Sequence, residues 1–173
     1  MIVKTEALVP VEEYLRTTYD PDCDYVDGEV LERNLGELDH SDLQGELLHY
    51  FRARRTSGKL FAFPGQRVQV STTRFRVPDI CVYVGKKPKD QIPTTPPFIC
   101  IEILSPEDRL ERTQQKIDDY LNFGMPYVFV INPRNRRAWS YTKDGSTEIK
   151  DGVLRTENPA LTVPLDEIFG ELE

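Results

Sequence analysis

The sequence has no apolar run long enough to cross a bilayer, since its longest runs, such as residues 127–131, fall far short of about 20 residues. Its first ten residues, MIVKTEALVP, lack the apolar segment and the small-residue cleavage site of a secretion signal. Cysteine is scarce and widely spaced, at Cys23, Cys81 and Cys100, which excludes a disulfide framework. We therefore expect a cytoplasmic protein with reduced thiols and no membrane association.

Several common catalytic motifs are also missing. The chain contains no glycine-rich phosphate loop, no cysteine and histidine spacing typical of zinc, and no GxSxG sequence. Its two histidines, His40 and His49, stand in no recognisable nucleophile motif. These absences argue against P-loop enzymes, zinc hydrolases and Ser-His-Asp hydrolases.

The composition fits a folded chain of 173 residues, of which 39% are hydrophobic and 29% are charged. This length is typical of one domain, and the apolar content is sufficient for a core. We predict a single domain over residues 1–173.

The net charge of −7 hides an uneven distribution. Residues 20–46 contain ten acids and one base, whereas residues 47–143 contain seventeen bases and eight acids. A basic block of this kind can bind phosphates, although the same residues can simply cover solvated helix faces. The acidic segment can bind a basic partner or pair two subunits.

Hydrophobic periodicity and turn signals predict a mixed α/β fold. A short helix begins at Pro10, and the Asp27-Gly28 turn predicts a hairpin over residues 23–33. The remaining predicted elements are a helix capped by Asp39 or Ser41 and ending near residue 55, strands at 59–63, 66–71, 76–84 and 98–104, a helix at 106–123, and strands at 127–132 and 136–142. Together they predict a mixed sheet flanked by helices, preceded by an N-terminal helix and hairpin.

Two acids interrupt apolar strand sequences, Asp79 in VPDICVY and Glu102 in ICIEIL. Buried acids are rare unless they are paired or bind a cation. Two acids on central strands can share Mg²⁺, which takes one or two carboxylates and keeps several waters. Each acid can instead pair with an arginine such as Arg76 or Arg109. Considered together, the two acids favour a metal site.

The order Pro78-Asp79 followed by Glu102 resembles the PD-(D/E)XK nuclease motif, but Leu104 stands where that motif has lysine. Lys116, on the following helix, is a candidate replacement. It lies at the edge of the predicted stripe of Leu110, Ile117 and Leu121, so its ammonium can reach the end of the Glu102 strand. The simpler alternative is a flanking lysine paired with Asp118 or Asp119.

The chain also resembles the Uma-type putative restriction endonucleases from about residue 11 to residue 169. The matching segments are VEEYL at 11–15, DYVDGEV at 24–30, His40, VPD at 77–79, EILSP at 102–106, Lys116 with Tyr120, GMPY at 124–127 and VINP at 130–133. Asp24 and Val77 depart from the residues expected of the family, where glutamate and arginine are commoner. The resemblance implies a restriction-endonuclease-like fold, DNA as substrate, and a catalytic lysine displaced onto the helix.

Three further residues are weaker catalytic candidates: His40, Glu46 and Glu29. His40 can act as a ligand, a general base or a phosphate contact, or can be an ordinary half-buried histidine. Many nucleases of the PD-(D/E)XK superfamily have an additional acid on the first core helix, and Glu46 is the candidate for it here. Glu29 matches an acid that recurs in the family after the hairpin turn. Both can also be solvated surface charges.

We therefore predict a metal-dependent DNA endonuclease in which Asp79 and Glu102 bind Mg²⁺, with Mn²⁺ as a substitute, and Lys116 completes the catalytic site. We expect a homodimer, as for many nucleases of this superfamily. The alternative is a non-catalytic DNA-binding or protein-interaction module on the same fold.

Overall fold

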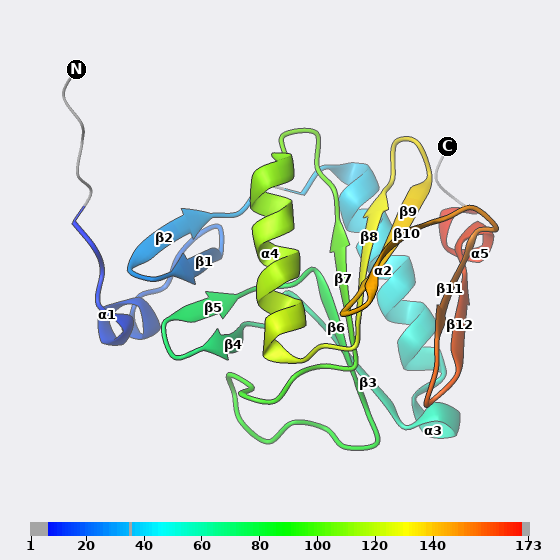
Figure 1. Ribbon diagram of the computed structural model, residues 1–173, viewed down its shortest axis with the longest axis horizontal. Coiled ribbons are helices and arrows are strands. Elements are labelled where there is room, and N and C mark those ends of the chain that lie inside the picture. The colour runs from blue at the N-terminus through cyan, green and yellow to red at the C-terminus, as the bar shows by residue number, and fades with distance from the viewer. Residues whose placement is uncertain (1–6, 35, 171–173) are drawn as a thin grey trace.

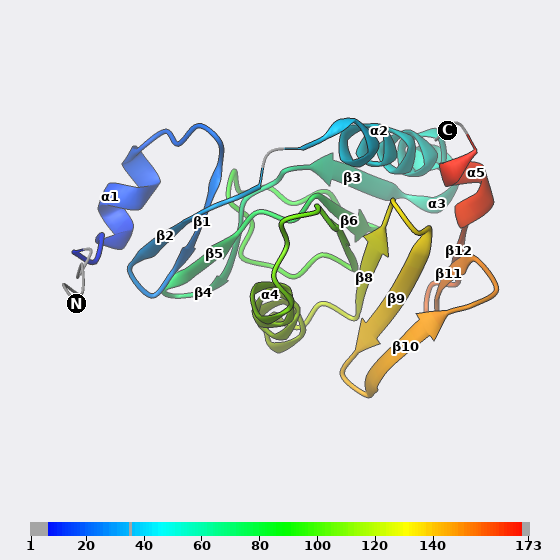
Figure 2. The same cartoon turned by 90° about the horizontal axis from the view of Figure 1, so that it is seen from above.

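The computed structural model describes residues 7–34 and 36–170 and contains a six-stranded mixed sheet with helices on both faces (Figure 1; Figure 2). The helices are α1 (Val11–Arg16), α2 (Leu38–Ala53), α3 (Arg55–Gly58), α4 (Leu110–Phe123) and α5 (Leu165–Phe169). The strands are β1 (Cys23–Val26), β2 (Glu29–Glu32), β3 (Leu60–Pro64), β4 (Val68–Ser71), β5 (Arg74–Arg76), β6 (Ile80–Val84), β7 (Ile99–Ile103), β8 (Tyr127–Asn132), β9 (Arg137–Thr142), β10 (Gly145–Ile149), β11 (Val153–Thr156) and β12 (Leu161–Pro164).

The six strands follow the order β10-β9-β8-β7-β6-β3. The β7–β8 pair is parallel, and the other pairs of this sheet are antiparallel. A parallel pair needs a long crossover connection, which α4 provides here. Strand β7 is buried along its whole length, as expected of a central strand.

Two helices cover opposite faces of this sheet (Figure 2). Leu43 and Leu47 of α2 belong to the same buried cluster as Ile101, whereas Ile117 of α4 belongs to a second cluster with Cys100. Because neighbouring side chains in a strand point to opposite faces, β7 supplies residues to both clusters. The face under α4 is the face on which Glu102 lies.

A second, antiparallel sheet has the order β2-β1-β5-β4 and carries the N-terminal hairpin. Asp27 and Gly28 have φ values of 51° and 100° at the turn, which matches the strong preference of this dipeptide for tight hairpins. Helix α1 packs against this sheet through Tyr14, whose hydroxyl donates a hydrogen bond to the Cys23 carbonyl at 2.9 Å. The predicted mixed sheet with an N-terminal helix and hairpin is confirmed.

Three local predictions are wrong. The segment predicted as one strand over residues 76–84 is two strands, β5 and β6, which belong to different sheets. They are separated at Val77-Pro78-Asp79, where Pro78 has no N–H to donate to a ladder. Helix α4 begins at Leu110 rather than at residue 106, and Leu110 is 88% exposed rather than buried. Helix α2 begins at Leu38, with Glu37 at its N-cap in place of Asp39 or Ser41.

All three cysteines are buried and free, as predicted. Among the described residues, no helix combines the length and the apolar character that a bilayer crossing requires. We predicted one domain over residues 1–173 and no secretion signal at the start of the chain. Both predictions include residues at the chain ends, 1–6 and 171–173, that lie outside the described range.

Candidate active site

Asp79 and Glu102 lie at the same end of the β6–β7 pair. Ile80, the first residue of β6, pairs with Ile101 of β7, so Asp79 directly precedes this pair and Glu102 directly follows it. Both acids are buried, with exposed fractions of 3% and 5%. Two carboxylates predicted from separate strands thus form one site.

The Asp79 carboxylate is bound by a cation, a histidine and the backbone. Its Oδ1 accepts a hydrogen bond from Arg33 at 2.7 Å, and His40 Nε2 lies 3.3 Å from the same oxygen. Its Oδ2 accepts the N–H of Ile103 at 2.8 Å, which ties the side chain to β7. Gln44 of α2 donates to the Asp79 carbonyl. The position of Asp79 is therefore fixed from both strands and from α2.

The Glu102 carboxylate is bound by two side chains of α4. Lys116 Nζ lies 3.1 Å from Oε2, and the Tyr120 hydroxyl donates to Oε1 at 2.5 Å. Lys116 and Tyr120 are four residues apart, so they project from one face of the helix. The parallel crossover places this face over the end of β7. The structure therefore brings Lys116 to Glu102, whereas the alternative partner Asp119 binds Arg74 and Arg76.

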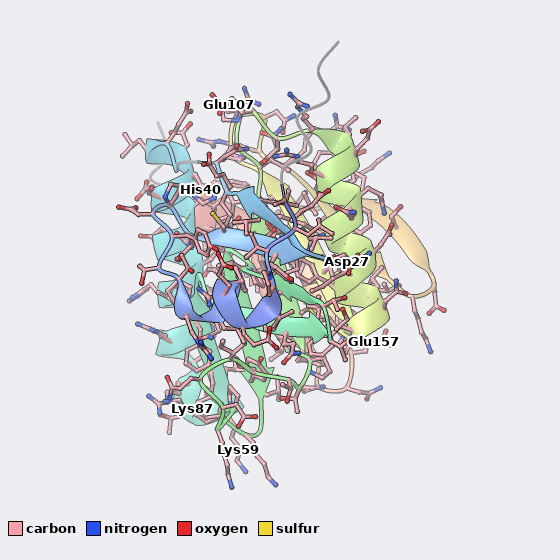
Figure 3. All side chains as sticks on the ribbon, turned by 90° about the vertical axis from the view of Figure 1, so that its left-hand side faces the viewer. Asp27, His40, Lys59, Lys87, Glu107 and Glu157 are labelled. Carbon is pink, nitrogen blue, oxygen red and sulfur yellow. The ribbon has the colours of Figure 1, made fainter. Side chains whose placement is uncertain are left out.

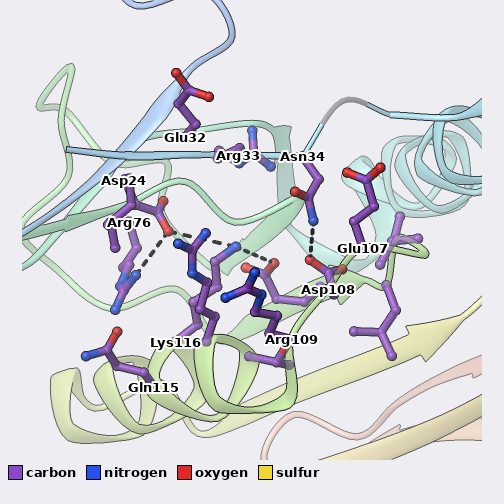
Figure 4. Close-up of a pocket in the computed structure, with 16 residues that line it drawn as sticks. Asp24, Glu32, Arg33, Asn34, Arg76, Glu107, Asp108, Arg109, Gln115 and Lys116 are labelled. Carbon is purple, nitrogen blue, oxygen red and sulfur yellow. Dashed lines mark hydrogen bonds and ion pairs between the residues drawn. The ribbon is translucent and has the colours of Figure 1, made fainter. Parts of the chain in front are cut away.

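A buried ionic network continues from this site toward the hairpin sheet. Asp24 accepts hydrogen bonds from Arg76 at 3.1 Å and from the Val77 N–H at 2.9 Å, and it lies 3.8 Å from Lys116 (Figure 4). Arg76 also donates to Asp119 of α4 at 2.7 Å. The network therefore ties β1, β5 and α4 together next to Lys116.

Burial and neighbouring charge set the protonation of the two acids. Burial and the nearby Asp79 charge raise the pKa of Glu102 above its ordinary value, against the opposing effects of Lys116 and Tyr120. Burial also disfavours ionised Asp79, but the His40 hydrogen bond and the Arg33 charge outweigh it and lower the pKa of Asp79. Two carboxylates repelling each other in a buried site would be stabilised by an additional cation.

Lys116 and His40 are both held toward their charged forms. Burial disfavours the Lys116 ammonium, but Glu102, Asp24 and Asp79 raise its pKa overall. For His40, burial is likewise outweighed by the hydrogen bond and charge of Asp79, and its pKa is raised. Lys116 is therefore a cation at neutral pH, suited to stabilise negative charge rather than to accept a proton.

A cavity of about 410 Å³ opens next to these residues (Figure 4). Arg33, Glu102 and Lys116 line it, and Arg109 and Arg112 from the start of α4 add two further cations. Asp79 does not reach the cavity surface, because the Arg33 guanidinium is bound to its Oδ1. Asp24, Glu32, Glu107 and Asp108 also line the cavity, so a phosphate entering it would meet carboxylates as well as cations.

The donor set fits a hard divalent ion in chemical type. Asp79 and Glu102 supply the carboxylate oxygens that Mg²⁺ prefers, and the adjacent cavity has room for its waters. Within the described residues, no group of three or more His, Cys, Asp or Glu side chains forms a ready-made metal cluster. Coordination through Asp79 Oδ1 requires Arg33 to leave that oxygen.

The weaker candidates have different positions. The structure brings His40 into the site through Asp79. Glu29 is exposed in the hairpin, and Glu46 is partly exposed on α2. Neither of these two carboxylates forms a hydrogen bond or ion pair with another described residue of the site. Their catalytic roles stay predictions, without a contact that supports them.

Sequence reasoning missed the parts of the site that come from β1, β2 and the segment after the hairpin. Neither Arg33 nor Asp24 was predicted as a candidate site residue from the sequence. The available signal was the presence of charged residues inside apolar strand sequences, since Asp24 and Arg76 interrupt CDYV and FRV. That signal marks a buried charge but does not name its partner.

Replacing Tyr120 with phenylalanine is expected to lower the free energy of unfolding by about 1–3 kcal/mol, because Glu102 Oε1 loses its buried hydrogen-bond donor. The control is Tyr127→Phe, which removes a hydroxyl that bonds to the Glu157 backbone at an exposed position. Chemical denaturation measures both variants. Equal, small effects for the two would show that the Tyr120–Glu102 bond contributes little.

The mixed sheet flanked by helices has the restriction-endonuclease-like fold. A solved structure titled as a putative nuclease belonging to DUF820 from Anabaena variabilis has the same fold, with a TM-score of 0.78 and 20% sequence identity. The match covers 92% of this chain and 96% of that chain. The chain belongs to the Uma2 family, described as putative restriction endonucleases, whose model matches residues 11–170. A comparison with curated proteins found no match.

Proposed function

We propose that this protein is a metal-dependent DNA endonuclease whose catalytic residues are Asp79, Glu102 and Lys116. The observation that carries the proposal is the pair of buried carboxylates at one end of the β6–β7 pair, with Lys116 Nζ 3.1 Å from Glu102 and a polar cavity beside them. Asp79 and Glu102 would hold Mg²⁺, with Mn²⁺ as a substitute. The chemistry supplied by the bound ion is polarisation of the phosphate and activation of a water.

The residues of the chain do the remaining work. Glu102 and Asp79 are oriented by Tyr120 and by the Ile103 N–H, so their oxygens are fixed before substrate arrives. Lys116 is placed to orient the attacking water and to stabilise the negative charge that develops on the phosphate. Hydrolysis then breaks a P–O bond by in-line attack.

Arg33 is the group that competes for Asp79. The Arg33→Ala variant is expected to bind Mn²⁺ about tenfold more tightly than the wild type, because Asp79 Oδ1 becomes free and a neighbouring positive charge is removed. Electron paramagnetic resonance of free Mn²⁺ measures this affinity without any cleavage assay. The control is Arg155→Ala, which removes an exposed arginine that is paired with Asp151. Weaker Mn²⁺ binding by Arg33→Ala would mean that Arg33 supports the metal site instead.

The function is tested with a panel of plasmid, linear duplex and single-stranded DNA incubated with Mg²⁺ or Mn²⁺. We expect cutting with either ion and none in EDTA. The panel also identifies the form of DNA that is cut. A protein that cuts equally well in EDTA would contradict metal dependence.

One observation favours a second candidate, a non-catalytic DNA-binding module on the same fold. Both Asp79 oxygens and both Glu102 oxygens already have partners within the chain. In such a module the acids would only neutralise Arg33 and Lys116. This candidate predicts salt-dependent DNA binding with no turnover and no measurable Mn²⁺ affinity.

We further propose that the enzyme acts in the cytoplasm, as one domain and as a homodimer. The three free, buried cysteines support a reducing compartment. The separation of an acidic segment at 20–46 from a basic block at 47–143 supports pairing of unlike surfaces between two copies. Sedimentation at increasing ionic strength is expected to show a dimer that dissociates as salt rises.

A further inference from the structure

A second basic feature lies away from the acid pair, along the outer edge of the six-stranded sheet. Strand β3 is the last strand on that side. Arg52, Arg55 and Lys87 line a groove of about 330 Å³ over it, together with Phe61 and Phe63. The arginines come from the end of α2 and from α3, whereas Lys87 comes from the loop after β6. We call this feature the β3 groove.

The β3 groove is lined by cations without a compensating acid. Arg52, Arg55 and Lys87 are exposed, and none forms an ion pair with a described residue. Arg55 Cζ lies 5.3 Å from the centre of the Phe61 ring, and Lys87 Nζ lies 5.8 Å from that of Phe63. Both cations therefore lie near aromatic rings of β3, and their charge stays uncompensated. Figure 3 shows Lys87 with Lys59 at the end of the molecule away from Glu107.

The β3 groove is connected to the acid pair by strand register. Phe61 pairs with Tyr83 and Phe63 with Cys81, and Pro64 at the end of β3 pairs with Ile80, the residue after Asp79. The end of β3 meets the site, because the Gly65 N–H donates to the Asp79 carbonyl at 3.1 Å. The strand itself spans roughly 14 Å, which corresponds to about four base steps of one DNA strand.

We propose that the β3 groove binds the phosphate backbone of the DNA that the acid pair cuts, a few nucleotides away from the scissile phosphate. This inference rests on the proposed function for the identity of the ligand. Charge complementarity selects a polyanion, because three uncompensated cations lie in one groove. A second copy of the chain bound groove to groove would bring these same cations together. Contacts to phosphates carry no sequence preference, so the groove contributes affinity rather than specificity.

The test compares a groove variant, R52E/R55E/K87E, with a control variant, R16E/K143E/K150E. The control makes the same charge change at exposed residues outside the groove. Fluorescence anisotropy with a labelled duplex in EDTA measures affinity over a range of KCl concentrations. We expect the groove variant to bind about tenfold or more weakly than the control, with a salt slope reduced by about 0.9 for each lost phosphate contact. Circular dichroism verifies that both variants fold.

Several outcomes overturn this inference: equal affinities of the two variants, an unchanged salt slope in the groove variant, or a wild-type protein that binds no DNA. Because EDTA prevents metal-dependent turnover, the result does not depend on cleavage. If the groove variant alone loses binding while the wild type never cuts DNA, the groove stands and the proposed nuclease activity fails. If the wild type cuts DNA but the groove variant binds normally, the groove assignment fails by itself.

Discussion

The Asp79→Asn variant is expected to lose metal-dependent DNA cleavage by at least about 10³-fold, which corresponds to about 4 kcal/mol in activation free energy. Asparagine keeps the volume of the side chain and can still accept the Ile103 N–H. It removes the negative charge that a divalent ion requires and leaves Arg33 without its carboxylate partner. The loss should therefore appear both in Mn²⁺ affinity and in the cleavage rate.

The control for this experiment is Asp151→Asn, an exposed aspartate that forms an ion pair with Arg155 at 2.6 Å. Surface pairs of this kind contribute little, so the control should cut DNA like the wild type. Thermal denaturation of both variants separates a catalytic loss from unfolding. Cleavage by Asp79→Asn at the wild-type rate, with unchanged metal affinity, would remove Asp79 from the proposed site.

The Lys116→Met variant is expected to retain Mn²⁺ binding and to lose about 10²–10³-fold in the rate of cleavage. Methionine keeps most of the apolar stem that packs along α4 but removes the ammonium beside Glu102 Oε2. The metal-binding carboxylates then lose a competing cation, whereas the developing charge on the phosphate loses a stabilising one. The separation of these two effects distinguishes a catalytic lysine from a structural one.

Lys143→Met is the control, since Lys143 is exposed between β9 and β10. Single-turnover cleavage gives the rate, and paramagnetic resonance gives the metal affinity. If Lys116→Met cuts DNA at the wild-type rate, the lysine has not moved from the strand to the helix in this chain. If it loses metal binding as well as cleavage, Lys116 acts mainly by keeping Glu102 in place.

Periodicity and the family resemblance together predicted the part of the site that is local in sequence. Glu102 and Lys116 belong to consecutive elements, β7 and α4, and a parallel crossover fixes how such a helix lies on its strand. The helical repeat therefore placed Lys116 near Glu102. The same repeat failed for Leu110, the first residue of α4, which is 88% exposed.

Contacts between distant segments could not be read from the sequence. Arg33 binds Asp79 across 46 positions, and Arg76 binds Asp24 across 52. No periodic pattern in the sequence identifies the partner of a charged residue. The sequence therefore suggested Arg76 or Arg109 as a partner of Asp79, whereas the structure shows Arg33 in that place. The basic block over residues 47–143 was visible, but only the fold shows that residues 52, 55 and 87 lie in one groove.

The link Val77-Pro78-Asp79 joins the two sheets with three residues, and both of its ends are fixed. Val77 donates its N–H to Asp24 of the hairpin sheet, whereas Asp79 holds the β7 backbone at Ile103. An added or deleted residue here would move the acid away from the Ile103 N–H that it accepts and from Glu102. The loop over residues 85–98 has no such constraint from the acid pair. Evolutionary change in chain length is therefore expected in that loop, while the length of the link stays constant among relatives that keep the site.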